Sequence, residues 1–377
     1  MSSSSRVRVL LIGPALNILG GQAVQVKNLL ANLGQEPSIE MDFQAFGPEL
    51  PGPFRFLQGV YILRTVLNLA LYTLQLAFRV WRYDLVHVFS AGYSSYCLWT
   101  LPALLFAKLY RKKIVLHYHD GQGEDHLRRW RTAIPTIRMM DAVVAPSGFL
   151  VDVFARFGLR IRTISNTLAI EKFHYRPRSR LRPVVLHNRI MEPLYNIPCS
   201  LRAFQIVQQH YPEASLTLAH NGPSLAELEA LAQELQLRNT KFIGRVPHER
   251  VAELYDSADL YFTSPDFDNM PGSILECFAS GLPVVATATG GIPYIATNEE
   301  TALLIPTGDH QAMAQAALRL LEDPALVERL TANARASCAR YASGPVREQW
   351  TRLYHDVMKG DHTLRADGGA QSSAIRT

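Results

Sequence analysis

The chain has 377 residues, of which 48% are hydrophobic and 19% charged, with a formal net charge of +5. This composition excludes an intrinsically disordered chain, and the length predicts two domains of ordinary size. The charge is uneven, with 18 Lys and Arg against 10 Asp and Glu as far as Asn166, and 20 against 23 beyond it. A basic half is typical of proteins that meet nucleic acid, an anionic membrane surface or an anionic substrate. Because no known nucleic-acid signature is present, we expect no nucleic-acid partner.

The four cysteines are widely spaced and form no CxxC pair. Such cysteines are typical of reduced thiols, so we expect a cytoplasmic protein with no zinc site. The apolar run 9–12 is too short for a signal peptide and is interpreted as part of a first strand. Residues 1–5 and 360–377 are predicted to be disordered tails, because they are mostly small or polar and have no hydrophobic pattern.

Short apolar runs alternate with helical patterns along the whole chain, which is typical of parallel sheets built from βαβ units. The first six strands are predicted at residues 7–13, 41–46, 85–90, 114–119, 142–146 and 161–165. The next six are predicted at residues 184–187, 216–219, 241–244, 260–263, 284–286 and 302–305.

This order predicts an α/β protein with domains at 6–170 and 184–342. Residues 171–183 are basic, broken by proline and without periodicity, and are predicted to link the domains. A C-terminal helix at 343–359 is expected to pack back on the first domain. Two open parallel sheets would bind their ligands at the carboxyl ends of the strands, in a cleft between the domains.

Two segments of the first domain are unusually apolar. Residues 54–82 are rich in Leu, Val, Tyr and Phe, and residues 96–113 end in Arg-Lys-Lys. The uninterrupted apolar run 66–78 is shorter than the roughly 20 residues that a membrane-spanning helix needs. Two interpretations remain open: a peripheral membrane contact through both segments, or helices that only cover the sheet of the first domain.

The most informative passage is 264–276, which begins where the predicted strand 260–263 ends. Pro271 suits the first position of a helix, because its φ is fixed and its missing N–H would have no helical partner there. The helix is expected to end at Ser280, before Gly281. Amides at the start of a helix can bind an anion such as a diphosphate. The amides concerned are those of Gly272, Ser273, Ile274 and Leu275.

Two carboxylates flank this helix start, Asp268 in the loop and Glu276 about one turn into the helix. Carboxylates accept hydrogen bonds from hydroxyls, which sugars supply. A diphosphate between two sugar rings is a nucleotide sugar, so the segment predicts a nucleotide-sugar site. The alternatives are a solvated helix-surface acid for Glu276 and a helix-capping loop residue for Asp268.

This pattern resembles that of the family-4 retaining glycosyltransferases of the GT-B architecture. Their hallmark is two acidic residues with seven between them, followed by a small-residue helix end and a strand. Asp268 and Glu276 have this spacing, and residues 279–287 continue the match. Residues 290–293, Gly-Gly-Ile-Pro, also match, although Tyr294 stands at a position that is often acidic. The resemblance implies a GT-B fold of two Rossmann-like domains, whose parallel sheets face each other across a cleft.

The resemblance also implies roles for single residues. Glu276 would bind the ribose hydroxyls, Asp268 the hydroxyls of the transferred sugar, and the amides near Ser273 the diphosphate. Arg189 follows the first strand of the second domain, where the family carries an arginine that contacts the donor phosphates. A guanidinium suits this role because it can bind two phosphate oxygens at once. The family's companion lysine, five or six residues later, is replaced by a leucine and a tyrosine.

Residues of the first domain are expected to complete the site. Gly20 and Gly21 follow the first strand, where glycine lets the backbone approach a phosphate or a sugar closely. His119 ends the fourth strand, and the resemblance implies a histidine there beside the transferred sugar. His117 shares its face of the strand, and the alternative for both is a hydrogen-bonded core histidine. His126 lies in a predicted loop over the acceptor, without the spacing of a metal site.

We therefore predict a hexosyltransferase that moves a sugar from a nucleoside diphosphate sugar to an acceptor hydroxyl. The expected catalytic residues are His119, Arg189 and Asp268, without metal or other cofactor. Retention of the anomeric configuration is implied by the resemblance alone. The acceptor is predicted to be a glycan or a lipid-linked molecule at the cytoplasmic face of a membrane, in bacterial surface polysaccharide or glycolipid assembly. Two alternatives remain open, a nucleotide-sugar epimerase of the same fold and a non-catalytic nucleotide-sugar binder.

Overall fold

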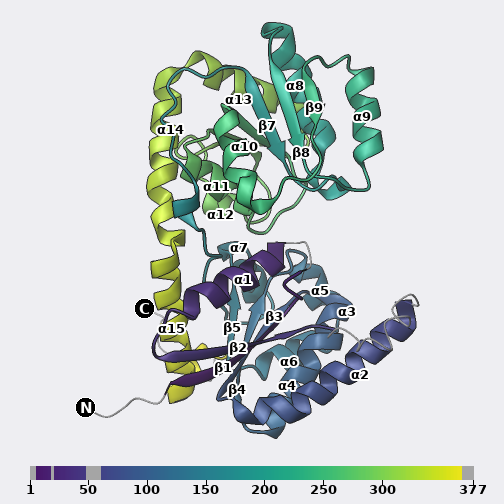
Figure 1. Cartoon of the computed structure of the whole chain (residues 1–377), viewed down its shortest axis with the longest axis vertical. Coiled ribbons are helices and arrows are strands. Elements are labelled where there is room, and N and C mark those ends of the chain that lie inside the picture. The colour runs from purple at the N-terminus through teal and green to yellow at the C-terminus, as the bar shows by residue number, and fades with distance from the viewer. Residues whose placement is uncertain (1–5, 18–20, 48–60, 367–377) are drawn as a thin grey trace, which may run out of the picture. The chain divides into compact units, whose positions relative to one another are not determined.

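A computed structural model describes residues 6–17, 21–47 and 61–366 of the chain (Figure 1). The chain divides into two compact units. The first unit comprises residues 1–167 together with 343–377, and the second comprises residues 168–342. The second unit is therefore an insertion between two parts of the first.

The first unit contains a parallel sheet of six strands in the order β2-β1-β3-β4-β5-β6. Its strands are β1 (Val7–Gly13), β2 (Ile39–Ala45), β3 (Leu85–Ser90), β4 (Lys113–Tyr118), β5 (Ala142–Ala145) and β6 (Arg162–Thr163). Its helices are α1 (Gly21–Leu33), α2 (Tyr61–Arg79), α3 (Tyr93–Ser95), α4 (Leu101–Leu109), α5 (Gly123–Arg129), α6 (Ala133–Arg138), α7 (Gly148–Ala155) and α15 (Ser343–Lys359). A π-helical segment, η3 (Tyr96–Thr100), joins α3 to α4.

Helices cover both faces of this sheet, because successive side chains of a strand point to opposite faces. Val9 and Leu11 of β1 pack in one core with residues of α1 and α15, among them the fully buried Trp350 (Figure 1). Leu10 and Ile12 pack in the other core with residues of α2, α4 and α7. The sequence predicted the central strands β1, β3, β4 and β5 because a strand buried on both faces is mostly apolar, whereas the edge strands β2 and β6 also contain exposed polar residues.

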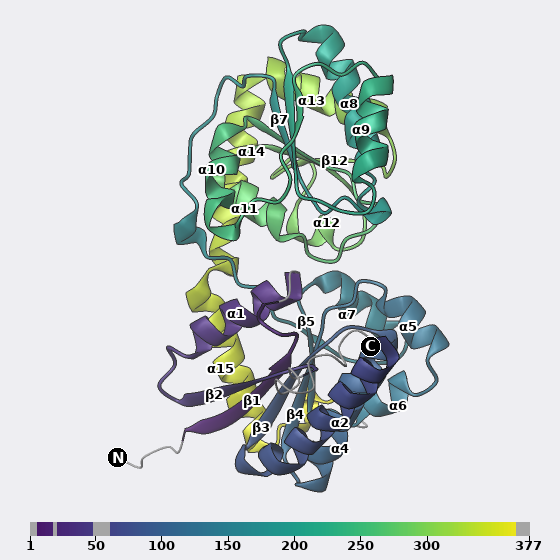
Figure 2. The same cartoon turned by 45° about the vertical axis from the view of Figure 1, so that its right-hand side comes forward.

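Helices α2 and α4 lie against each other in the first unit (Figure 2). One side of α2 is buried through Tyr72 and Leu76. Seven exposed apolar side chains lie on the opposite side of α2, in the 3-10 helix η2 (Val80–Arg82) that follows it, and on α4, and they are called here the apolar stripe: Leu63, Val66, Leu74, Phe78, Trp81, Leu105 and Leu109. Within the described ranges, no helix is long and apolar enough to cross a bilayer.

The second unit contains a parallel sheet of six strands in the order β12-β11-β10-β7-β8-β9. Its strands are β7 (Val184–Asn188), β8 (Ser215–Ala219), β9 (Thr240–Phe242), β10 (Leu260–Thr263), β11 (Val284–Thr287) and β12 (Leu303–Ile305). Its helices are α8 (Ile197–His210), α9 (Leu225–Glu234), α10 (Val251–Ser257), α11 (Gly272–Ser280), α12 (Ile292–Ile295), α13 (His310–Glu322) and α14 (Pro324–Ser337). One core lies with α8 and α13, and the other with α10, α11 and α14.

The basic segment expected to link the domains packs on the second unit. Arg178 is 4% exposed and donates to the carbonyls of Ser280 at 2.7 Å and Tyr255 at 3.0 Å. Asp259 is 2% exposed and accepts from the guanidinium of Arg182 at 2.7 Å. Arg176 and Arg178 also pair with Asp259. The segment is basic because its arginines satisfy buried acceptors, and the expectation of a plain connecting linker is wrong for residues 176–182.

The predicted C-terminal tail also differs from the structure. Residues 360–366 include a short 3-10 helix, η8 (His362–Leu364), and both Leu364 and Ala366 are buried in the first unit. The carbonyl of Ala366 accepts from the amide of Arg160 at 3.0 Å. Two isolated apolar side chains anchor this stretch, which a search for hydrophobic periodicity does not detect. Residues 1–5 and 367–377 lie outside the described residues.

Candidate functional site

The helix start of the predicted site lies at the carboxyl end of β10. Pro271 has φ −67° and ψ 110°, so it is the N-cap of α11 and not its first helical residue as expected. The amides of Gly272 and Ser273 therefore lie at the head of the helix, whereas that of Ile274 donates to the Pro271 carbonyl at 3.3 Å. Leu275 is one residue further in, where helical amides bond back along the helix. The anion-binding capacity thus shifts toward Gly272 and Ser273.

The loop before α11 is fixed by the last residue of β11 and by residues that follow this strand. Thr287 and Thr289 donate from their hydroxyls to the carbonyls of Pro265 at 2.7 Å and Asp266 at 2.8 Å. The amide of Gly291 donates to the carbonyl of Asp268 at 2.8 Å. A Cβ on Gly291 would lie 1.6 Å from the carbonyl oxygen of Asn269, so only glycine fits. Gly290 has φ +53°, and a Cβ there would lie 2.2 Å from the carbonyl oxygen of Asp268, so both glycines are required next to the Asp268 backbone.

Arg189 connects three parts of the predicted donor site. Its guanidinium forms an ion pair with Asp268 and donates to the Ser273 hydroxyl at 3.3 Å. The same guanidinium lies 4.4 Å from the ring centroid of Tyr195. Burial would lower the pKa of Arg189, but the charge of Asp268 outweighs this effect and the pKa is raised. Arg189 therefore stays cationic at the head of α11, beside the amides that can bind phosphate.

Glu276 lies on α11 and accepts a hydrogen bond from the hydroxyl of Tyr255 at 2.6 Å. Tyr255 is fully buried on α10, and burial, followed by the charge of Glu276, raises its pKa well above the ordinary value. The tyrosine therefore remains a donor and aims the carboxylate. This contact could not be predicted, because a tyrosine on the apolar side of a helix cannot be distinguished from an ordinary core residue by its position in the sequence. The stacking of Tyr195 on Arg189 was missed for a similar reason.

In the first unit, His119 directly follows β4 and its amide donates to the Ser90 carbonyl at 2.9 Å. Its ring stacks on Phe89, with centroids 4.8 Å apart and planes 19° apart. Burial lowers the pKa of His119 to about 3, so the imidazole is neutral at pH 7. Gly21 begins α1, and a Cβ there would meet open space, whereas Gly20 lies outside the described residues.

The prediction of a loop around His126 that covers the acceptor is wrong, because this segment is helical. Residues 123–129 form helix α5, and His126 is fully buried with its Nδ1 2.9 Å from the hydroxyl of Tyr118. Glu124 pairs with Arg128 and Arg156 on the helix surface. Gly121 and Gly123 suggested a loop. Gly123 is instead the first residue of α5, where an added Cβ would lie 3.2 Å from both Tyr118 and Leu150. His126 is therefore a core residue of the first unit.

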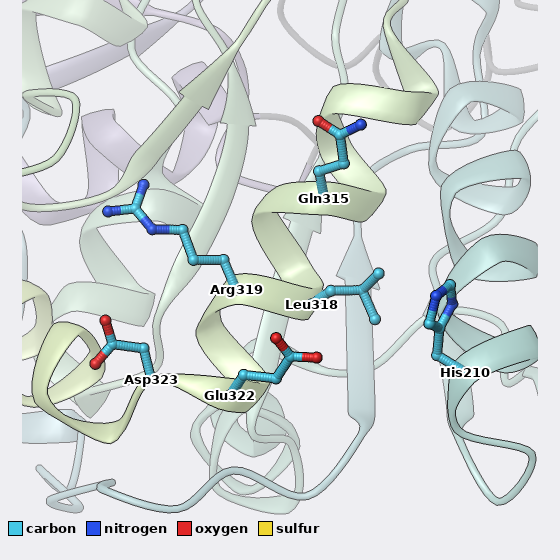
Figure 3. A pocket seen from close by; sticks show the side chains of 6 residues that line it. All are labelled: His210, Gln315, Leu318, Arg319, Glu322 and Asp323. Atoms are coloured by element: carbon cyan, nitrogen blue, oxygen red, sulfur yellow. The ribbon is translucent and has the colours of Figure 1, made fainter.

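A cavity of about 340 Å³ in the second unit lies between α8 and α13 (Figure 3). Its lining residues are His210, Gln315, Leu318, Arg319, Glu322 and Asp323. The cavity lies where α8 leads into β8, at the amino edge of the sheet, whereas the predicted site is at the carboxyl edge. Arg319 pairs with Glu299, and Asp323 accepts from the amide of Leu326 to cap α14. Arg319 and Asp323 thus have structural partners, and no predicted site residue lines the cavity.

Parts of the chain are similar to curated bacterial enzymes. An exopolysaccharide phosphotransferase of Streptomyces coelicolor is 29% identical, over 49% of this chain and 20% of the relative. The N-acetyl-alpha-D-glucosaminyl L-malate synthase of Bacillus anthracis is 29% identical, over 40% of this chain and 39% of the relative. This chain therefore spans less than half the length of either curated relative.

A solved structure shows the same fold. HepE of Anabaena, in complex with UDP and glucose, superposes with a TM-score of 0.72 at 18% identity, covering 93% of this chain and all of HepE. Two family models also match in succession, Glycosyltransferase Family 4 over residues 19–172 and Glycosyl transferases group 1 over residues 176–337. The predicted family is confirmed: the chain belongs to glycosyltransferase family 4 and has the GT-B fold.

Proposed function

We propose that the protein transfers a hexose from a nucleoside diphosphate sugar to an acceptor hydroxyl, with retention of configuration and without a metal ion. The observation that carries this proposal is the convergence of Arg189, Asp268 and Ser273 at the head of α11. The complex of HepE with UDP and glucose supports a UDP-sugar as the first donor to test.

The proposed chemistry follows from the charges at this site. The guanidinium of Arg189 and the first amides of α11 would stabilise the negative charge that develops on the leaving diphosphate. Glu276 would bind the ribose hydroxyls, and Asp268 and His119 would bind the transferred sugar. The leaving phosphate would accept the proton of the acceptor hydroxyl on the side where the new bond forms. Because Arg189 supplies the positive charge, activity is expected to persist in EDTA.

A donor screen with one variant tests the donor site. A cognate nucleotide sugar at 100 times its Kd should stabilise the protein by about 2.7 kcal/mol, seen as a rise in Tm. Glu276→Ala should lose most of this rise, because the ribose hydroxyls lose their acceptor. Glu227→Ala, which removes an exposed acid of α9, is the control and should keep the full rise. An equal rise in both variants would reject the role of Glu276.

Release of nucleotide separates transfer from the two alternatives. A transferase releases UDP only when the acceptor is present or when water replaces it. An epimerase of the same fold would convert the donor to its isomer without releasing nucleotide, and a non-catalytic binder would return the donor unchanged.

We further propose a lipid-linked acceptor at the cytoplasmic face of a membrane, in surface polysaccharide or glycolipid assembly. The similarity to an exopolysaccharide enzyme supports the pathway. The apolar stripe on α2 and α4 supports the membrane contact, since Val66, Phe78 and Leu105 are each more than half exposed. Arg82 directly follows Trp81, Arg111 follows the end of α4, and both are exposed; cations beside an apolar surface favour anionic lipid.

Vesicle sedimentation tests the membrane contact. The protein should sediment with vesicles that contain phosphatidylglycerol at low salt, and much less with phosphatidylcholine alone. The double variant Phe78→Ser with Trp81→Ser should remain in the supernatant, because both side chains are lost from the stripe. Met139→Ser removes an exposed apolar side chain of the same unit outside the stripe and should sediment like the wild type. Complete recovery of wild-type protein in the supernatant would reject the proposal.

A further inference from the structure

A line of buried polar side chains runs from α15 to the end of β4 in the first unit. The hydroxyl of Tyr354 lies 2.6 Å from Nδ1 of His87. Nε2 of His87 lies 3.3 Å from Nδ1 of His117 on the neighbouring strand. None of the three is more than 3% exposed. The three side chains are therefore joined by two hydrogen bonds inside an otherwise apolar core.

The rings at the strand end continue this line to His119. The centroids of His117 and His119 are 4.1 Å apart, because residues i and i+2 share one face of a strand. Trp350 packs against His87 and His117 at 4.7 and 4.8 Å and holds both rings from the side of α15. The rings of His117 and His119 are thus in direct contact, so a change in the position of the His117 ring acts directly on His119.

The two hydrogen bonds couple the tautomers of His87 and His117. Burial lowers the pKa of His87 to about 3 and that of His117 well below its usual value, so each ring is neutral with one donor and one acceptor nitrogen. If Tyr354 donates to His87, then His87 donates to His117 and the proton of His117 lies on Nε2; if Tyr354 accepts, every bond reverses. Nε2 of His117 is buried without a hydrogen-bond partner among the described residues, so its state depends on this line.

We propose that Tyr354, His87 and His117 are positioning residues, which fix the tautomer of His117 and thereby the orientation of the His119 ring. The proposal rests on the proposed function, in which His119 contacts the transferred sugar. Apolar side chains would fill the same core without the cost of burying polar groups, so a function for the line explains its presence. Through Tyr354, helix α15 would thus also influence the site, although it lies far in sequence from the residues at the strand ends.

Tyr354→Phe tests the line because it removes one hydroxyl and keeps the ring. Tyr72→Phe is the matched control, since Tyr72 is equally buried in the same unit and donates to the carbonyl of Trp99 at 2.8 Å. With 15N-labelled histidine, the ring nitrogens of His87 and His117 should move toward tautomer-averaged positions in Tyr354→Phe only. With UDP-glucose or the donor found by screening, kcat should fall about fivefold in Tyr354→Phe at unchanged KM.

Two further results decide the matter. His87→Gln, which keeps a donor and an acceptor, should retain more of kcat than His87→Leu, and equal losses would overturn the proposal. If the 15N signals of the ring nitrogens change equally in Tyr354→Phe and Tyr72→Phe, the proposed coupling through Tyr354, His87 and His117 is rejected. This measurement needs no sugar donor. Ring nitrogens that move while kcat falls equally in both variants overturn the positioning role. Failure of the proposed function would show elsewhere, as wild-type protein that releases no nucleotide from any sugar donor.

Discussion

Arg189 meets a carboxylate at the place where the proposed mechanism puts a phosphate. Asp268 neutralises much of its charge, and Ser273 and Tyr195 hold the guanidinium between them. A diphosphate would share this cation with Asp268, so the carboxylate weakens the binding of the leaving diphosphate by Arg189. The missing lysine of the family makes this balance depend on one cation.

Asp268→Ala should therefore separate binding from transfer. Without the carboxylate, Arg189 offers its full charge to phosphate, so UDP should bind at least as tightly as to the wild type. Transfer should fall by about 100-fold or more, because the sugar loses a hydrogen-bonding partner in the transition state. Calorimetric titration with UDP and initial rates measure the two effects, with Arg189→Ala as the contrasting variant that weakens UDP binding. Weaker UDP binding by Asp268→Ala would contradict this view of the pair.

At the scale of elements, Asp259 anchors the start of the second unit. Burial would raise the pKa of its carboxyl, but hydrogen bonds from Arg182 and Arg176 outweigh burial and lower it. Because the pKa is lowered on folding, the stabilisation by ionised Asp259 is fully present at pH values above the pKa of the unfolded chain. It is lost as the pH falls through the pKa of the folded chain. The arginines of 176–182 thus fix the segment through a single acid.

Asp259→Ala should lower the free energy of unfolding by about 3–5 kcal/mol, because Arg178 stays buried without its acid. Asp84→Ala is the control, since it breaks an ion pair whose side chains are 50% and 27% exposed, at Arg8 and Asp84. Solvent screens such an exposed pair, so its loss should change the stability very little. Urea denaturation at pH 7 measures both, and similar losses in the two variants would disagree with the assignment of Asp259 as an anchor.

The elements show where sequence reasoning succeeds. Each of the twelve strands overlaps a predicted one, and the central strands were predicted because doubly covered strands are mostly apolar runs. The edge strand β6 is only two residues long and both are exposed, so its predicted span of five was too long. The start of α11 was predicted one residue early, because the φ of Pro271 fits either position and only its ψ of 110° decides.

The site was predictable only where its residues are close in sequence. Asp268 and Ser273 come from one motif, and Arg189 was added through the family resemblance. Tyr255 and Tyr195 could not be predicted, because their contacts depend on how α10 and the turn after β7 pack. The line through His87 also joins residues more than 200 positions apart, from β3 to α15.

At the scale of the whole molecule, buried neutral histidines make stability depend on pH. Burial, reinforced by the charge of Arg189, lowers the pKa of His187 to about 3, and it is fully buried in β7. Between pH 6.5 and about 3 the unfolded chain binds a proton there that the folded chain does not. The contribution of this histidine to the free energy of unfolding is thus fully present above this pH range. It falls by about 1.4 kcal/mol per pH unit as the pH is lowered through the range.

His187→Leu should flatten this dependence by about that amount, because the unfolded chain no longer gains the proton. His210→Gln removes an exposed histidine of the same unit and should leave the slope unchanged. Urea denaturation at several pH values between 4 and 7 provides the comparison. A slope that is the same in both variants would show that His187 titrates alike in the folded and unfolded chains.

The insertion of the second unit between two parts of the first has a consequence for synthesis on the ribosome. Residues 1–167 emerge first, yet the core behind Val9 and Leu11 is completed by Trp350 and Tyr354. Helix α1 covers part of this sheet face, but the part that α15 covers must stay open while residues 168–342 are made. The second unit, contiguous in sequence, can fold before the first is closed by α15.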